Sequence, residues 1–127
     1  MTNLTDLTVD STTIGGQNLP APSSHAYVSA GAIAEKHGCV TLAKTSAGTM
    51  AMTVVNPVAT TDDYKILHIL NAQAQANTVA VTASTFGNST GTDYDVATFG
   101  AAVGNTLTLM AYQGYWYVIG AFACTLA

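Results

Sequence analysis

A short segment near the C-terminal end constrains the fold more than any other part of the chain. Residues 106–120, TLTLMAYQGYWYVIG, place aliphatic and aromatic residues on both sides of Gln113-Gly114. A glycine at the second position of a two-residue turn can adopt the positive φ that tight hairpins require. The segment therefore predicts a β-hairpin in which Tyr112 lies opposite Tyr115.

Side chains alternate between the two faces of a strand, so a two-residue turn assigns each hairpin residue to one face. One face is the expected core face, with Leu107, Leu109, Ala111, Trp116 and Val118. The other face is too apolar to be fully solvated, and we expect a second sheet or another copy of the chain to cover it. Thr108 belongs to this second face, and its expected contact residues are Met110, Tyr112, Tyr115, Tyr117 and Ile119.

Four further segments have the composition of short strands and are separated by turn-forming residues. Residues 65–71, KILHILN, are apolar on both faces and predict a central strand. Residues 26–38, AYVSAGAIAEKHG, favour either a strand or a short helix, and residues 72–77, AQAQAN, are expected to be a simple link. The other three strand-like segments are residues 39–44, 49–55 and 78–83.

Together with the hairpin and a short apolar tail at residues 121–127, these segments make about seven short strands, without a convincing long amphipathic helix. This pattern predicts an all-β fold. We expect a single jelly-roll-like β-sandwich of short antiparallel strands over residues 25–127.

The first 24 residues differ from the rest. Apolar residues are spaced among Thr and Asp, and Gly15-Gly16, Pro20 and Pro22 follow within a few positions. Such a cluster does not propagate a helix, so residues 1–24 are expected to be an extended arm and linker. The arm is either a terminus without a role or a segment that orders on a neighbour's sheet edge or groove.

Charge excludes several classes of function. Charged residues make up 8% of the chain, there is no arginine, and the formal net charge is −4. Three scattered lysines cannot form a basic stripe, which argues against nucleic acid and against anionic membrane surfaces. No apolar run approaches the roughly 20 residues of a membrane span. The N-terminal residues lack the basic and apolar regions of a secretory signal, so we expect no signal-dependent export.

The histidines and cysteines do not form a recognisable site. His25, His37 and His68 are not spaced as metal ligands or as a base beside a nucleophile. We expect His68 to be a hydrogen-bonded core or interface residue and His37 to lie in a solvated loop. In a chain without an export signal, Cys39 and Cys124 are expected to be free and buried.

Two acidic clusters, Asp62-Asp63 and Asp93-Tyr94-Asp95, are the remaining catalytic candidates. Paired carboxylates could serve glycoside hydrolysis or hold calcium. Both clusters lie in Thr- and Gly-rich segments, where aspartates commonly make turns with their own backbone, and we favour this interpretation. Phosphate-binding and serine-nucleophile motifs are absent. The sequence therefore predicts a protein that is not an enzyme and has no cofactor or metal.

Three blocks resemble small structural proteins of tailed bacteriophages, namely capsid decoration (cement) proteins and head-fibre-like proteins. The blocks are GCVTLAKTSAGTMAMTV (residues 38–54), TTDDYKILHIL (residues 60–70) and DVATFGAAVGNTLTLMAYQGYWYVIG (residues 95–120). The most specific pieces are D-x-A-T-F-G and A-Y-x-G-x-W-Y-V. None of them is a catalytic signature.

The resemblance implies a trimeric jelly-roll-like domain that sits on the outer surface of the phage head and bridges subunits of the major capsid protein. The protein would be made in the host cytoplasm and located in the virion. Its arm would be the anchor, with Leu4, Leu7, Val9 and Ile14 buried against the capsid. The alternative is a tail-fibre or head-fibre binding module that recognises host-surface glycans. Its candidate contacts are Tyr64, Tyr94, Tyr112 and Tyr115.

Overall fold

The computed structural model describes residues 11–14, 17–20, 23–82, 85–88 and 93–127, and these ranges contain strands and no helix. β1 (Ser11–Ile14) and β2 (Gln17–Pro20) pair antiparallel as a separate two-stranded sheet in the expected arm. Of the expected anchor residues, Leu4, Leu7 and Val9 lie outside the described residues, and Ile14 ends β1.

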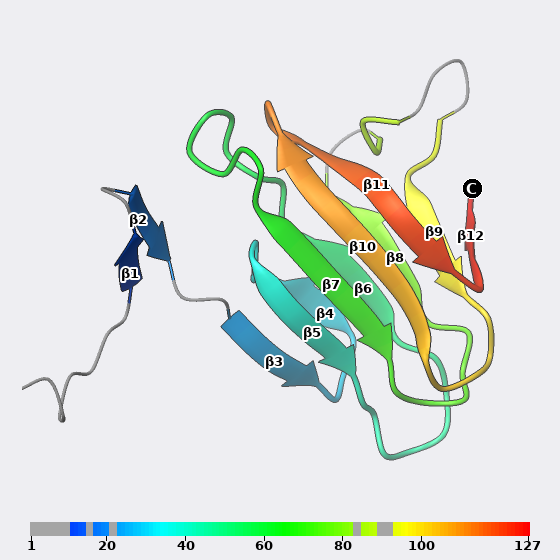
Figure 1. Cartoon of the computed structure of the whole chain (residues 1–127). Coiled ribbons are helices and arrows are strands. Elements are labelled where there is room, and N and C mark those ends of the chain that lie inside the picture. The colour runs from blue at the N-terminus through cyan, green and yellow to red at the C-terminus, as the bar shows by residue number, and fades with distance from the viewer. Residues whose placement is uncertain (1–10, 15–16, 21–22, 83–84, 89–92) are drawn as a thin grey trace, which may run out of the picture.

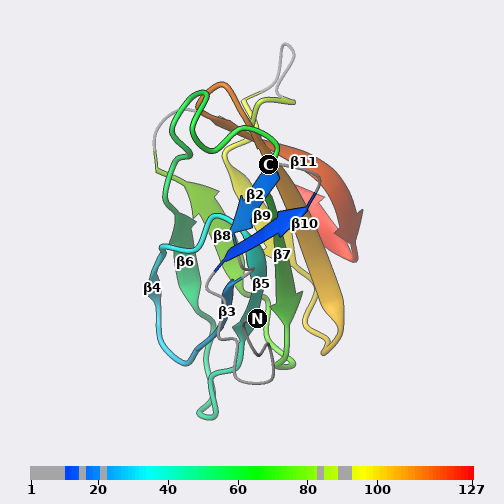
Figure 2. The ribbon, with the colours of Figure 1, turned by 60° about the vertical axis from the view of Figure 1, so that its left-hand side comes forward.

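The other strands form two five-stranded sheets that pack as two layers (Figures 1 and 2). In spatial order, sheet I contains β11 (Tyr115–Phe122), β10 (Asn105–Tyr112), β7 (Ile66–Asn71), β5 (Gly38–Leu42) and β3 (Ser23–Tyr27). Sheet II contains β12 (Cys124–Leu126), β9 (Val96–Phe99), β8 (Thr78–Val81), β6 (Ala51–Val54) and β4 (Gly31–Ile33).

The all-β sandwich is confirmed, but the expectation of antiparallel strands is wrong for half of the pairings in the two sheets. Pairs β3–β5, β5–β7, β4–β6 and β6–β8 are parallel. From β3 to β8 the chain crosses to the other sheet after every strand, so it re-enters each sheet in the same direction. These connections are not those of an antiparallel jelly roll.

Strand number and boundaries also differ from the sequence-based expectation. The two sheets hold five strands each, against about seven predicted in total. The segment that favoured either strand or helix contributes to β3 and forms β4. β3 begins at Ser23, so the sandwich starts two residues before the expected boundary. β7 is the central strand of sheet I, as its two apolar faces predicted.

The C-terminal hairpin has the predicted register. Tyr112 pairs with Tyr115 and Leu109 pairs with Val118. The turn residues Gln113 and Gly114 both have positive φ, 49° and 84°, as a two-residue hairpin turn requires. The register then shifts by one residue, which places Thr108 opposite Gly120 and leaves Ile119 between two paired positions.

The core lies between the sheets, and the predicted core face of the hairpin contributes to it. Leu107, Leu109, Ala111 and Trp116 are buried, and Val118 is partly buried against them. The indole Nε1 of Trp116 donates a hydrogen bond to the carbonyl oxygen of Val55, 2.9 Å away, which satisfies its one polar group. The buried hydrophobic residues of the other strands include Ile33, Val40, Leu42, Met52, Val54, Leu67, Ile69, Val79, Ala97 and Phe99.

A cluster of buried amide side chains lies among β7, the β7–β8 connection and the 100–105 segment. Asn77 accepts hydrogen bonds from the Met50 N–H (2.7 Å) and from Gln73 Nε2 (2.9 Å), and its Nδ2 donates to Asn71 Oδ1 (2.8 Å). Asn71 and Asn105 both donate to the carbonyl oxygen of Gly100. The segment that was expected to be a simple link therefore supplies buried structural residues.

Candidate functional site

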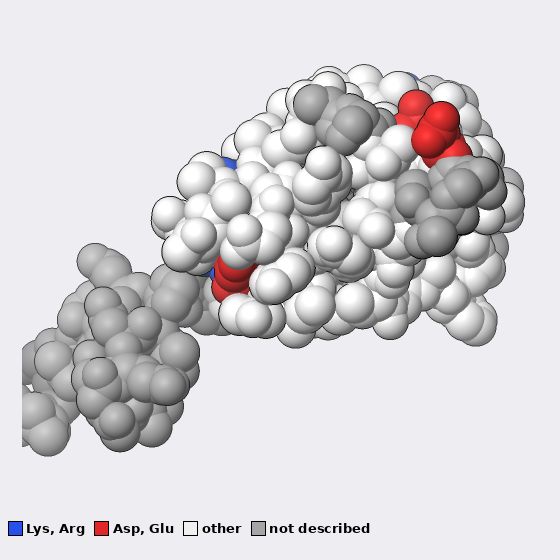
Figure 3. Space-filling model, turned by 90° about the horizontal axis from the view of Figure 1, so that it is seen from above, with Lys and Arg blue, Asp and Glu red and all other residues white. Residues whose placement is uncertain are grey.

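The outer face of sheet I is the candidate functional surface. The strand register identifies the side chains on this face, because residues that alternate with the buried ones point away from the core. None of the five strands contains an Asp, Glu, Lys or Arg residue. In the described ranges, the charged residues lie in the loops instead. Seen from above, the molecule shows a few small charged patches among uncharged residues (Figure 3). No second sheet of the described chain covers this face.

Tyrosines gather at one end of the face, around the hairpin turn. The ring centroids of Tyr64 and Tyr112 are 5.7 Å apart, and those of Tyr112 and Tyr117 are 6.3 Å apart. Tyr64, Tyr112 and Tyr115 remain 69%, 40% and 46% exposed. The predicted contact residues Tyr112, Tyr115, Tyr117 and Met110 thus share the outer face of sheet I, where Tyr112 and Tyr115 are exposed and Tyr117 and Met110 are partly exposed.

The loop before β7 holds this tyrosine cluster in place. Both carboxylate oxygens of Asp63 accept hydrogen bonds of 2.7 Å from Gln113, one from the backbone N–H and one from the side-chain amide. The backbone N–H of Tyr64 donates to the carbonyl oxygen of Ala111 at 2.7 Å. Tyr64 has a φ of 69°, which is unfavourable for a bulky residue. The hydrogen bonds therefore maintain a strained backbone next to an exposed aromatic ring.

Asp62 has a structural role in the same loop. Its side chain is 5% exposed and forms ion pairs with Lys65 (2.6 Å) and Lys36 (3.0 Å). It also accepts a hydrogen bond from the Val58 N–H. Burial by itself would raise the pKa of Asp62, but the hydrogen bonds from Lys65, Val58 and Lys36 outweigh it and hold the pKa well below its usual range. Asp62 and Asp63 thus accept hydrogen bonds from the backbone of their own loop, at Val58 and Thr60, as the turn interpretation predicts, whereas the two ion pairs of Asp62 were not predicted.

A short segment covers the first half of the exposed edge of β11. The Gly87 N–H donates to the Trp116 carbonyl oxygen, and Asn88 exchanges two hydrogen bonds with the backbone of Val118. An added Cβ at Gly87 would lie 2.4–2.6 Å from the ring of Tyr117, so only glycine fits at this distance. A shallow pocket of about 260 Å³ lies between this segment, Tyr115 and Tyr117.

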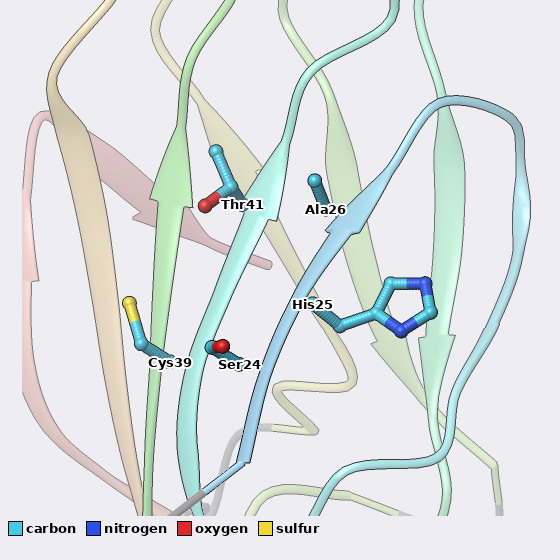
Figure 4. Close-up of a pocket in the computed structure, with 5 residues that line it drawn as sticks. All are labelled: Ser24, His25, Ala26, Cys39 and Thr41. Carbon is cyan, nitrogen blue, oxygen red and sulfur yellow. The ribbon is translucent and has the colours of Figure 1, made fainter.

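A second depression, of about 270 Å³, lies at the other side of the same face, between β3 and β5. We call it the hollow, and small side chains line most of it. Figure 4 shows these residues, with the His25 ring turned away from Cys39 and Thr41. Cys39 is free but exposed, so the expectation that it is buried is wrong; Cys124 is free and partly buried. The lining residues of the hollow are Ser24, His25, Ala26, Cys39 and Thr41.

The three histidines lie in different surroundings. His25 Nδ1 is 3.1 Å from the carboxylate of Glu35, which also accepts a hydrogen bond from the Tyr27 hydroxyl. Burial and the contact with Glu35 raise the pKa of Tyr27. His68 is exposed on the outer face, with Nδ1 3.2 Å from the Thr108 hydroxyl, so it is not a core residue.

His37 is only partly exposed, and its Nδ1 is buried without a hydrogen-bond partner in the described part of the chain. This position differs from the solvated loop that was expected. Across residues 11–14, 17–20, 23–82, 85–88 and 93–127, no group of three His, Cys, Asp or Glu side chains is placed to hold a metal ion.

The chain was compared with protein-family models, with curated proteins and with solved structures, and none of the three comparisons found a match. Within the described ranges there is no helix that is long and apolar enough to cross a membrane.

Proposed function

We propose that this protein is a virion structural protein of a tailed phage, a decoration or cement protein that binds the outer surface of the head and bridges major capsid protein subunits. The observation that carries the proposal is the uncharged outer surface of the sandwich. Sheet I exposes tyrosines and aliphatic residues without a single Asp, Glu, Lys or Arg on its strands. The outer positions of sheet II are equally neutral and are Ala32, Ala51, Thr53, Thr78, Ala80, Val96, Thr98 and Thr125.

Such a surface suits a subunit of an assembly better than a free protein. Net charge and charged edge residues normally keep β-proteins soluble and separate. A chain without charged residues on the strands of either sheet gains solubility and stability when those faces are covered, here by copies of itself and by the capsid. The sequence resemblance supplies the kind of assembly, and the copy contact involves Met110, Tyr112, Tyr115, Tyr117 and Ile119.

A cement protein needs no reaction to act. A subunit that binds the assembled shell and not its separated parts stabilises the shell by mass action. The carboxylates of Asp62 and Asp63 support a function without a reaction, because both are engaged in hydrogen bonds that hold the loop before β7. The N-terminal arm is proposed as the anchor to the capsid.

Deletion of residues 1–22 is expected to leave a folded oligomer that no longer binds capsids. The cut stops before β3, so the sandwich keeps all of its strands. Binding would be measured by co-sedimentation with phage heads that lack the protein. A full-length variant with Leu4→Ser, Leu7→Ser and Val9→Ser is the matched control for arm length, and it should also fail to bind. Full occupancy of the heads by the truncated protein would overturn the anchor proposal.

The tyrosine cluster favours a second candidate function, the binding of host-surface glycans. Aromatic faces near hydroxyl groups suit sugar rings, and Tyr64 is held in a strained conformation beside Tyr112. This function would need the cluster to be free of other copies. Saturable binding on a glycan array that Tyr64→Ala abolishes, from a protein without affinity for capsids, would place this candidate first.

A further inference from the structure

We propose that copies of this chain associate head to tail, with Phe122 of one copy seated in the hollow between β3 and β5 of the next. The inference rests on the proposed association of copies and names the contact that holds them together. It depends on three observations about sheet I: an exposed aromatic side chain at one edge, a hollow at the opposite edge, and the shared height of the two along the strands.

Phe122 is the exposed aromatic side chain. It ends β11, an edge strand of sheet I, and is 67% exposed. The pairing of Phe122 with Thr106 places it on the outer face, because Leu107 and Ala121 form the neighbouring pair and Leu107 is buried. Among the described residues 85–88, the hydrogen bonds to β11 reach Trp116 and Val118, in the first half of the strand. A phenyl ring in this position exposes a large apolar area that association would remove from water.

The hollow offers the complementary shape. The side chains of Ser24, Ala26, Cys39 and Thr41 are all small, and they leave a depression of about 270 Å³ on the outer face. β3 is the other edge strand of sheet I. The Phe122 of the same copy cannot reach it. Neighbouring strands lie about 4.8 Å apart, so the four strand spacings between β11 and β3 amount to about 19 Å.

The register places the ring and the hollow at the same height along the strands. One row across sheet I consists of Ala26, Thr41, Leu70, Thr106 and Phe122. A rotation about an axis parallel to the strands preserves height, and it brings the β11 edge of one copy to the β3 edge of the next. Repetition of such a head-to-tail contact closes a ring when the rotation between neighbouring copies divides a full turn. Three copies, the number implied by the sequence resemblance, satisfy this geometry.

Charge favours another copy as the occupant of the hollow. The next row across the sheet consists of Ser24, Cys39, His68, Thr108 and Gly120. Neither row contains an Asp, Glu, Lys or Arg residue, so two copies meet without like-charge repulsion and without the burial of an unpaired carboxylate or ammonium group. A strongly charged partner would find no counter-charge on these rows.

The native cysteine in the hollow provides a direct test. In the full-length Phe122→Cys variant, the new thiol should lie beside Cys39 of the next copy, and mild oxidation should form an inter-copy disulfide. The expected product on a non-reducing gel is a covalently closed trimer that reductant returns to monomers. The double variant Phe122→Cys, Cys39→Ser should give no such product. Val58→Cys, an exposed position in the loop before β7, is the control for random collision.

Phe122→Ala provides the second measurement. Because the side chain is exposed, the fold should persist, whereas the protein concentration needed for half-association should rise about tenfold or more in light scattering. Cross-linked dimers that require Cys39 would support the contact and overturn the three-copy ring. An oligomer that forms no Cys39-dependent cross-link, or that Phe122→Ala leaves intact, would overturn the contact. Capsid binding, measured separately, would then still decide the decoration function.

Discussion

Replacement of Asn77 with alanine is expected to lower the free energy of unfolding by about 3–5 kcal/mol, more than any other single substitution that we propose. The substitution removes one buried amide that serves three partners. The Met50 N–H and the Gln73 amide lose their acceptor, and Asn71 Oδ1 loses its donor. Each buried polar group left without a partner costs about 1–3 kcal/mol. A loss of this size is a large fraction of the roughly 5–15 kcal/mol that stabilises a typical domain.

Urea denaturation monitored by Trp116 fluorescence would measure the effect, and Asn88→Ala is the matched control. Asn88 also makes two hydrogen bonds, to the backbone of Val118, but it is exposed. Water can replace its bonds, so its loss should cost only about 1 kcal/mol. Equal destabilisation by the two substitutions would show that burial of the amide cluster does not contribute to stability.

Asp62→Asn is expected to cost about 2–3 kcal/mol at neutral pH, because two ion pairs lose their anion. Lys36 and Lys65 would then face each other across a neutral amide, and the Val58 N–H would retain at most a weaker acceptor. The cost exceeds that of a typical surface ion pair, because the Asp62 side chain is only 5% exposed.

The effect of Asp62→Asn should depend on pH in a defined direction. The pKa of Asp62 is held below the value of about 3.9 that an aspartate has in the unfolded chain. A lowered pKa contributes stability above the unfolded value, and this contribution is lost as the pH falls through the folded one. The difference between the wild type and Asp62→Asn should therefore be constant above about pH 5 and shrink progressively below about pH 4.

Denaturation curves between pH 7 and strongly acidic conditions would test this dependence. Asp95→Asn, which removes an exposed carboxylate, is the control and should change stability little at any pH. A difference between wild type and Asp62→Asn that is unchanged down to strongly acidic pH would contradict the assignment of the two lysines as its cause.

The candidate surface could be predicted from the sequence only in part. The face with Met110, Tyr112, Tyr115 and Tyr117 follows from strand alternation and the Gln113-Gly114 turn, both of which are local. The hollow could not be predicted, because no local pattern shows that β3 pairs with β5. These two strands join the sheet of the hairpin only because β5 pairs with β7 and β7 pairs with β10. The signal that was available is the small size of the side chains in these two segments.

Long-range hydrogen bonding also escaped prediction. Asn77 and Asn71 lie in or beside a segment whose Ala- and Gln-rich composition suggests a simple connection, yet they are buried. Their partners include Met50 and Gly100, which are distant in sequence. The need for a glycine at position 87 could not be predicted locally either. It arises because the ring of Tyr117 packs too close to the Gly87 Cα to leave room for a Cβ.

The sequence by itself determined that this chain is a β-sandwich, which hairpin face is buried, and that few of its residues are charged. These properties follow from side-chain alternation, turn chemistry and composition, which act over a few residues. Only the tertiary structure decided that half of the sheet pairings are parallel, and that Phe122 and the hollow lie at opposite edges of one row. Alternation with a period of two is the same in parallel and antiparallel strands, so pairing direction is settled by how the whole chain crosses between the sheets.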